Sequence, residues 1–408
     1  MIKGPLHMDI RPILSSLRRS PTGAILVALQ IALALAVAVN SLYIIVQRLE
    51  LISRDPGIDV DNIFVVAWTP VGEKFGGEAT MREDLRILRE LPGVIAATTV
   101  NAIPLSGGGS ATSVYTQPGE KGRRVDMNYF EVDEQGVEAL GVRLAAGRNL
   151  DAAVVHKPDR NSSQFVPELL VTQAVADELY PGEPAVGKPV YSGLGQAATI
   201  VGIVDHMHGS WPGWDKVGNV ALVPRIADEN QARYLVRTRP GRLVEVMNAA
   251  DAALSKVDNG RVILRERTLR YYSDATYADD RAMAVYMSTV VGLLLGIAAL
   301  GIFGLAAFNV GTRTKQIGTR RAVGARRIDI VRYFFVENWL VTTVGVVAGC
   351  LLALLLGYWL STTFELPRLK LYYLVFGALG LWVVGLAATL VPARRAAAVS
   401  PAVATRTV

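Results

Sequence analysis

The sequence predicts an α-helical membrane protein with four transmembrane helices and a large α+β extracytoplasmic domain inserted between helices 1 and 2. The chain of 408 residues is 51% hydrophobic and only 19% charged. Its mean hydropathy of +0.31 is too high for an ordinary soluble protein of this size. Four apolar stretches are long enough to cross a bilayer, and basic residues gather beside them, as in cytoplasmic loops.

The net charge of +6 is segregated along the chain. Residues 48–283 hold 26 Lys and Arg against 32 Asp and Glu, a net charge of −6, so the remainder carries +12. The basic flanks are predicted to be cytoplasmic and the acidic segment to lie outside. Because the basic residues form no groove interleaved with aromatic ones, we exclude nucleic acid as a partner.

The N-terminal elements are predicted to be a cytoplasmic amphipathic helix over residues 1–20 and a first span over 21–47. The apolar residues of the first helix recur at i, i+3, i+4 and i+7, at Ile10, Ile13, Leu14 and Leu17. A cleaved signal peptide is the alternative for the first span. The span is longer than a usual signal-peptide core and no clear cleavage site follows it, so we favour an anchor.

Residues 48–267 are predicted to form the extracytoplasmic domain. Short β-like runs alternate here with helical ones, for example 63–66, 82–90, 94–100 and 172–179. Residues 268–310 contain no breaker before the second span, which predicts one continuous stalk and membrane helix.

The rest of the chain is predicted to hold a basic connection and two more spans. Residues 311–337 form a cytoplasmic coupling segment, 338–360 the third span, 361–370 a short outer loop, 371–391 the fourth span and 392–408 a cytoplasmic tail. Residues 311–332 carry seven Lys and Arg against the single acid Asp329, which fixes this side as cytoplasmic. Four spans then place both termini on that side.

Glycine pairs at four-residue spacing predict close helix packing in the membrane, at Gly292, Gly296, Gly345 and Gly349. No charged residue lies in the middle of a predicted span, which argues against a proton-coupled transporter or an ion pump. The single cysteine, Cys350, is interpreted as a packing residue.

Two motifs invite a ligand-binding interpretation, and we reject both. Gly182-Glu-Pro-Ala-Val-Gly-Lys188 has Walker A spacing, but Pro189 replaces the Ser or Thr that would bind magnesium. Asp205, His206 and His208 could supply metal ligands, but a solvated loop is favoured because no completing ligand is evident. We therefore predict no catalytic residue, no metal site and no directly bound cofactor.

Several segments resemble a known permease family. Arg313-Thr-Lys-Gln-Ile-Gly-Thr-Arg-Arg-Ala-Val-Gly-Ala325 is similar to the R-x-x-E-I-G-I-R-x-A-L-G-A segment of MacB-like and FtsX-like permeases, with Gln316 in the place of the usual Glu. The tail Pro392-Ala-Arg-Arg-Ala-Ala-Ala-Val-Ser-Pro401 resembles the closing segment of that family, and Glu337 matches a common family acid. The chain is thus identified as resembling a type VII ABC permease, a mechanotransmission protein.

The resemblance implies how such a chain works. Its partners would be a cytoplasmic ABC ATPase subunit on a separate chain, which binds ATP and Mg²⁺, a second permease copy or paralogue, and membrane lipid, with a periplasmic adaptor as a further candidate. The location would be the bacterial inner membrane with the large domain in the periplasm. The implied ATPase-coupling residues are Arg313, Lys315, Gln316, Ile317, Arg320, Arg321, Ala322, Val323, Gly324, Ala325 and Arg326.

The leading functional hypothesis is export or extraction of a substrate such as a peptide, a lipoprotein or an antimicrobial, driven by the partner ATPase. The alternative is an FtsX-like regulatory role, in which the same motion acts on an extracytoplasmic partner such as a cell-wall hydrolase. An anchored receptor or enzyme is a third hypothesis, which the coupling motif argues against. The chain itself is predicted not to be an enzyme.

Overall fold

The computed structural model describes residues 21–72, 75–155, 165–227, 230, 232–257, 260–364 and 369–400. The chain divides into two compact units. Residues Leu51–Asp279 form one unit, called here the outer domain, and the residues before and after it form the helical unit. The predicted amphipathic helix, residues 365–368 of the predicted outer loop and the end of the tail from residue 401 lie outside the described residues.

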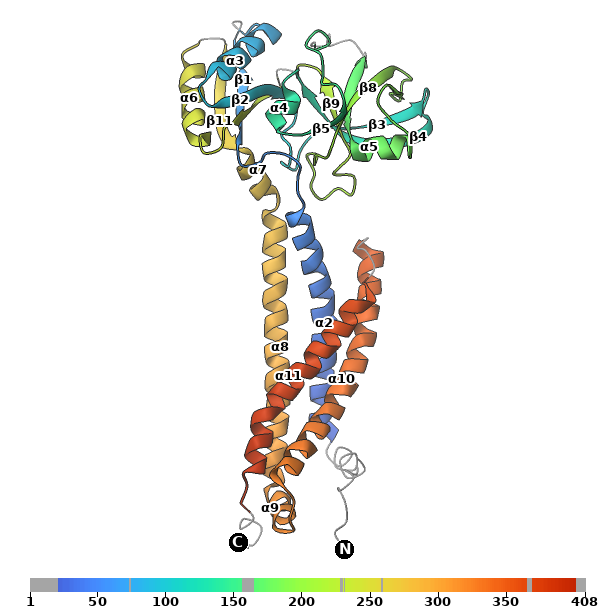
Figure 1. Ribbon diagram of the computed structural model, residues 1–408. Helices are drawn as coiled ribbons and strands as arrows, with labels where there is room; N and C mark the ends of the chain where they lie inside the picture. Colours follow the sequence, from blue (N-terminus) through green and yellow to red (C-terminus); the bar gives the residue numbers. More distant parts are fainter. Residues whose placement is uncertain are drawn as a thin grey trace. The chain divides into compact units, whose positions relative to one another are not determined.

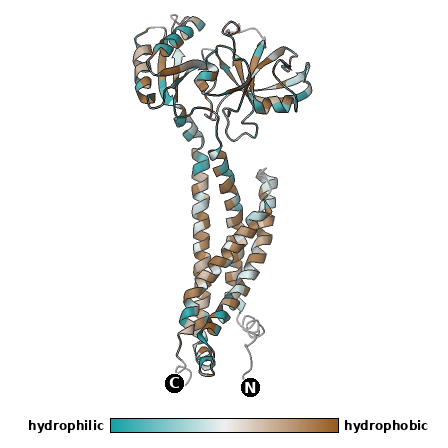
Figure 2. Cartoon of the chain, in the orientation of Figure 1, coloured by the Kyte–Doolittle hydropathy of each residue, from teal (hydrophilic) through white to brown (hydrophobic). Residues whose placement is uncertain are grey.

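The helical unit contains four long helices, α2 (Pro21–Ser53), α8 (Ala278–Thr312), α10 (Arg327–Phe364) and α11 (Leu371–Ala397), and one short helix, α9 (Thr314–Ala322). The four long helices are long and apolar enough to cross a membrane, judged by length and composition. Figure 2, in which each residue is coloured by its hydropathy, shows that these helices consist largely of hydrophobic residues. The predicted fold class, with the α+β domain between the first and second of these helices, is confirmed.

Apolar packing inside the helical unit centres on α2. Ile31 and Leu35 of α2 are fully buried against residues of α8, α10 and α11. A Cβ atom at Gly345 of α10 would lie 2.8 Å from the Ala28 carbonyl oxygen, and one at Gly349 would lie 2.9 Å from that of Ala32. The two glycines therefore lie where the backbones of α10 and α2 approach closely.

Several helices extend past the predicted limits of the spans. Helix α2 continues to Ser53, α10 begins at Arg327 within the predicted coupling segment, and α11 runs through Pro392 to Ala397. The prediction followed the apolar runs, whereas a helix satisfies its own backbone and can continue into polar sequence. Pro392 is buried within α11, where neighbouring helices can compensate for the lost hydrogen bond.

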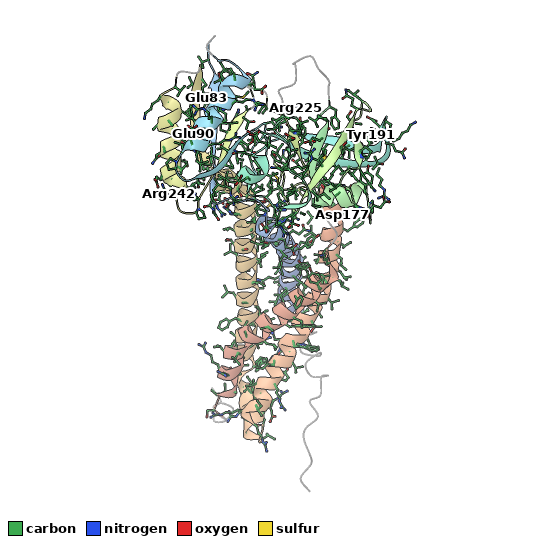
Figure 3. The ribbon with its side chains drawn as sticks, turned by 45° about the horizontal axis from the view of Figure 1, so that its top comes forward. Glu83, Glu90, Asp177, Tyr191, Arg225 and Arg242 are labelled. Carbon is green, nitrogen blue, oxygen red and sulfur yellow. The ribbon has the colours of Figure 1, made fainter. Side chains whose placement is uncertain are left out.

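The first sheet of the outer domain has the strand order β11-β1-β10-β2 and is antiparallel throughout. Its strands are β1 (Ile63–Pro70), β2 (Val94–Val100), β10 (Arg233–Thr238) and β11 (Arg261–Thr268). Phe64, Val66 and Trp68 alternate onto one face of β1 and pack with α3 (Glu78–Glu90) and α6 (Leu243–Ser255). The outward side of α3 carries Glu83 and Glu90 (Figure 3), both paired with Arg86 at 2.7 Å.

The second sheet has the order β5-β8-β6-β9-β4-β3-β7, and β7 also pairs with β8, so six strands close into a ring. Its strands are β3 (Ala111–Gln117), β4 (Lys121–Val132), β5 (Leu144–Gly147), β6 (Glu168–Thr172), β7 (Pro189–Tyr191), β8 (Ala197–Val204) and β9 (Val220–Pro224). Helix α5 (Gln173–Leu179) packs its buried residues into the core of this ring. Figure 1 shows the two sheets as separate lobes of the outer domain.

A third apolar core joins the two sheets of the outer domain. It combines Ile63 and Leu235 of the first sheet with Phe130 and Leu222 of the second, and with the short helix α4 (Gly136–Leu140). The outer domain therefore has one continuous α+β framework.

The predicted continuous stalk helix is wrong in one respect. Helix α7 (Leu269–Thr276) ends before Tyr277, and α8 starts at Ala278. Tyr277 adopts φ −87° and ψ 3°, and its N–H bonds to the Ser273 carbonyl oxygen at 3.1 Å. This break could not be predicted from the sequence, because no Gly or Pro lies between α7 and α8.

Candidate functional site

The candidate coupling site lies at the basic end of the helical unit, around α9. Helix α8 ends at Thr312, and Arg313 has a non-helical conformation before α9 begins. Helix α9 stops at Ala322, and Gly324 turns the chain with φ +104°, a conformation that favours glycine. The Asp329 carboxylate accepts a hydrogen bond from the Arg326 N–H at 2.9 Å and so stabilises the start of α10.

A small apolar cluster attaches α9 to the following helices. Ile317, which is 5% exposed, packs with Ile330 and Phe334 of α10. Three alanines of α11 complete the cluster, Ala393, Ala396 and Ala397. The Arg321 guanidinium also donates a hydrogen bond to the Ala397 carbonyl oxygen. Helices α9, α10 and the end of α11 are thus tied together by burial and by a charged donor.

A buried ion pair connects the end of α8 to α10. The Arg313 guanidinium lies 3.0 Å from the Glu337 carboxylate, and the side chains are 19% and 4% exposed. Arg313 also donates to the Tyr333 hydroxyl at 3.2 Å, and the Asn309 amide lies 3.4 Å from the second Glu337 oxygen. One turn of polar groups therefore links α8 to α10 next to the apolar cluster.

The polar connection continues from α10 to α11. The Asn338 amide donates to the Gly385 carbonyl oxygen at 3.0 Å, and both Asn338 and Glu337 are buried. Buried polar groups of this kind fix the relative position of helices, because displacement would leave them without partners.

The outward side of α9 is basic and partly apolar. The Arg320 guanidinium lies over the Tyr333 ring, 4.9 Å from its centroid. Beside it is a hollow of about 20 Å³, enough for one water molecule, lined by Arg313, Gln316, Ile317, Arg320, Ile330, Tyr333 and Phe334. Val323 is 84% exposed in the turn, and Ile328 is 52% exposed at the start of α10. An apolar tip surrounded by guanidinium groups is suited to contact a protein partner.

The coupling residues predicted from the sequence fall into two groups, those that make contacts inside the helical unit and those that are exposed on its surface. Arg313, Ile317 and Arg321 make contacts inside the helical unit. Lys315, Gln316, Arg320, Ala322, Val323, Gly324 and Arg326 are exposed, and Ala325 is half-buried. Among the described residues Gln316 accepts or donates no side-chain hydrogen bond, so the position that carries an acid in the resembled motif has no internal partner here.

The predicted packing glycines also divide. Gly345 and Gly349 lie against α2, as described above, whereas a Cβ atom at Gly292 or Gly296 of α8 would meet nothing within 4 Å. Sequence reasoning missed Gly301, where a Cβ would lie 2.3 Å from the Gln30 side-chain oxygen. It also missed Tyr333 as a partner of Arg313. Tyr333 lies four residues before Glu337 on α10, and this spacing places both side chains on the same face of the helix, which was the available signal.

The two rejected motifs lie in the outer domain. The Walker-like segment leads from α5 into strand β7 and not into a helix, and the Lys188 ammonium pairs with Glu183. His206 lies 3.4 Å from Asp55, and Asp205 pairs with Arg143. Burial lowers the pKa of His208. Within the described part of the chain no group of three or more His, Cys, Asp or Glu could hold a metal ion.

Two family models match this chain. The model of the MacB-like periplasmic core domain matches residues 23–255, which is more than half of the chain, and that of the FtsX-like permease C-terminal region matches residues 288–401. The chain belongs to the MacB-like and FtsX-like permease family. The second match includes α9 and its contacts with α10 and α11, and both models describe permease domains. This permease is therefore a membrane protein with an extracytoplasmic domain.

The relatives of this permease include the macrolide export ATP-binding/permease protein MacB of Bartonella quintana, 26% identical over 69% of this chain and 42% of that protein. MacB of Bordetella avium is 27% identical over 66% of this chain and 41% of its own length. The permease thus spans about two fifths of these relatives. The periplasmic region of MacB from Actinobacillus actinomycetemcomitans is 12% identical, with a TM-score of 0.33, and covers 55% of this chain and 97% of that one.

Proposed function

We propose that this chain is the permease subunit of an ABC transporter, in which an ABC ATPase binds α9 and drives the outer domain through the helical unit. The work done outside is the export or extraction of a substrate such as a peptide, a lipoprotein or an antimicrobial. One observation carries the proposal: α9 exposes an apolar, basic tip while Ile317 and Arg321 fix it to α10 and α11. The names of the relatives, which combine ATP binding with a permease, support it.

The exposed residues of this tip suit an interface with the ATPase. Val323 and Ile328 would enter an apolar pocket of the partner, and Lys315, Arg320 and Arg326 would face acidic groups around it. ATP and Mg²⁺ would be held by the ATPase. A force applied at Val323 would reach α10 and α11 through the Ile317 cluster and α8 through the Arg313–Glu337 ion pair.

The proposal includes an orientation in the bacterial inner membrane. The basic segment around α9 and both termini would be cytoplasmic, and the outer domain would be periplasmic, where an adaptor could bind it. The seven Lys and Arg of residues 311–332 support this orientation.

A second permease copy or a paralogue would complete the assembly. Helix α8 supports this part of the proposal, because Leu293, Ile297 and Leu300 are exposed and the open side at Gly292 and Gly296 would allow close approach of another helix.

Co-purification of this chain with candidate ABC ATPase subunits from the same organism tests the proposed contact. Val323→Asp and Arg320→Glu change exposed side chains and should leave the helical unit folded. Each should weaken ATPase binding by about 30-fold, as expected for a residue worth about 2 kcal/mol at an interface. Val244→Asp is the matched control, since Val244 is 68% exposed on α6 of the outer domain. Unchanged ATPase binding in both α9 variants would refute the proposal.

A further inference from the structure

The first sheet of the outer domain carries a cluster of arginines on the face opposite α3 and α6. Arg233 of β10 and Arg265 of β11 are both register partners of Ala67, so they flank this small residue on the same face. Neighbouring strands are about 4.8 Å apart, which separates the two arginine backbones by about 10 Å. Arg267 follows two residues after Arg265 on β11 and therefore shares this face.

Helix α7 places aromatic rings against this cluster. Leu269 at its start is fully buried in the core between the two sheets. The Arg267 guanidinium lies over the Tyr271 ring, 5.3 Å from its centroid. Burial raises the pKa of the Tyr272 hydroxyl, and the positive charges of Arg265, Arg233 and Arg267 act in the opposite direction. The charges of all three guanidinium groups therefore act on the Tyr272 hydroxyl.

No ion pair among the described residues balances the positive charge of this cluster. Within the described residues, Arg233, Arg265 and Arg267 make no ion pair with a carboxylate. Other arginines of the same sheet and of α7 are paired: Arg261 with Asp84, Arg237 with Asp59 and Arg270 with Asp61. Burial, and secondarily Arg265, lowers the pKa of Arg233. A half-buried cation without a carboxylate is costly, because it has lost water without gaining a counter-charge.

We propose that Arg233, Arg265 and Arg267, together with Tyr272, form a binding site for a phosphate-class anion. Three guanidinium groups offer more N–H donors than the two oxygens of a carboxylate can accept, whereas a phosphate has more oxygens and more negative charge. Ala67, between Arg233 and Arg265, carries only a methyl group. The exposed side chains of Arg265 and Arg267 lie on the edge strand β11, so the site opens to solvent. The anion is either a soluble phosphate or a lipid headgroup.

The simpler explanation is that the arginines only protect an exposed sheet edge from pairing with other chains. That explanation accounts for Arg265 and Arg267 on β11. It does not account for Arg233, which lies two strands further in and is half-buried. Nor does it account for the Tyr272 hydroxyl, on which the charges of all three arginines act.

A fluorescent reporter next to the site tests the proposal in the full chain. Leu264 is 59% exposed beside Arg265, and Cys350 is the only cysteine. Leu264→Cys in a Cys350→Ser background can therefore be labelled with bimane at one position. The labelled chain, in uncharged maltoside micelles, is titrated separately with inorganic phosphate, with monomeric dihexanoyl phosphatidylglycerol and with sodium acetate. The local reporter separates this site from the basic residues around α9.

The expected result is a saturable fluorescence change with a phosphate-bearing probe. Its midpoint concentration should be at least tenfold lower than that of acetate. The double variant Arg265→Gln with Arg267→Gln should raise this midpoint concentration at least tenfold. The double variant Arg265→Lys with Arg267→Lys, which keeps both positive charges, should raise it less. Arg123→Gln, an exposed arginine on β4, is the control and should leave it unchanged. Saturation by phosphatidylglycerol alone would identify a lipid headgroup, and saturation by phosphate would identify a soluble ligand. Equal response to acetate, no response, or a response that survives the double substitution would overturn the proposal.

Discussion

Removing one member of the Arg313–Glu337 ion pair should destabilise the helical unit, and the two single substitutions should differ. Arg313→Gln leaves a carboxylate that is 4% exposed, with Asn309 at 3.4 Å as its remaining polar contact. Loss of one partner from a buried pair costs about 3–5 kcal/mol. Glu337→Gln leaves Arg313, which is 19% exposed and still bonded to the Tyr333 hydroxyl. Because that cation keeps water and a partner, the cost should be nearer 1–3 kcal/mol.

The double variant Arg313→Gln with Glu337→Gln tests whether the loss of stability comes from an unpaired buried charge. It leaves no unpaired charge, so it should be more stable than Arg313→Gln alone. The assay is the fraction of monodisperse chain that remains after heating in maltoside micelles, compared as a midpoint temperature for the four proteins. The expected order is wild type, then Glu337→Gln, then Arg313→Gln as the least stable, with the double variant above Arg313→Gln. Additive losses in the double variant, or a larger loss in Glu337→Gln, would refute this reasoning.

Three further predictions concern other parts of the fold. Burial and the charge of Asp251 raise the pKa of Glu266 from 4.5 to about 7, so its folded-state penalty is absent below pH 4.5, grows as the pH rises from 4.5 to 7 and is complete above 7. Glu266→Gln should therefore stabilise the outer domain by about 1–2 kcal/mol at pH 8 but not at pH 4. Thermal unfolding at both pH values checks this, and equal gains would contradict it. Gly349→Val should destabilise the helical unit by about 1–3 kcal/mol through overlap with α2, whereas Gly296→Val should not lower the melting temperature of the monomer. Arg261→Gln should cost about 3–5 kcal/mol, because it removes the guanidinium that neutralises the fully buried Asp84 carboxylate. An unchanged denaturation midpoint would contradict this, and would show that the other contacts of Asp84, among them the Tyr234 hydroxyl that donates to it at 2.7 Å, are sufficient.

The membrane helices were predictable from the sequence because a bilayer imposes a simple rule, about 20 apolar residues per crossing. Their ends were not, since α10 begins in the polar sequence at Arg327 and α11 passes through Pro392. In the outer domain, strand β2 and helix α5 matched their patterns closely. Strands β3 and β4 were missed because their exposed positions mask the alternation of buried residues. No Gly or Pro signals the break at Tyr277 in the sequence.

The coupling segment shows the same division between local and tertiary information. The basic character of residues 311–332 and the resemblance of their motif were visible in the sequence. The roles of individual residues were not, because Arg313 and Arg321 look alike in the sequence as surface cations. The structure shows that Glu337 and the Ala397 carbonyl oxygen engage them. Arg321→Glu would therefore disturb the attachment of α9 to α11, and Arg320→Glu is the cleaner test of a partner contact.

The uneven packing of the helical unit bears on how a force at α9 would be transmitted. Helix α8 buries only Ala284, Ala298, Ile302 and Ala306 among its described residues, while α2 buries eleven. Polar contacts also connect it to the other helices: Arg48 with Asp280 at 2.7 Å, Gln30 with the Ile297 carbonyl oxygen at 2.7 Å, and Arg313 with Glu337. Little apolar area is lost if α8 separates from α2, so packing opposes that movement weakly. The ion pair at Glu337 would then decide whether α8 follows α10 when α9 moves, which is why the Arg313 and Glu337 variants should uncouple ATP hydrolysis from the outer domain even where the ATPase still binds.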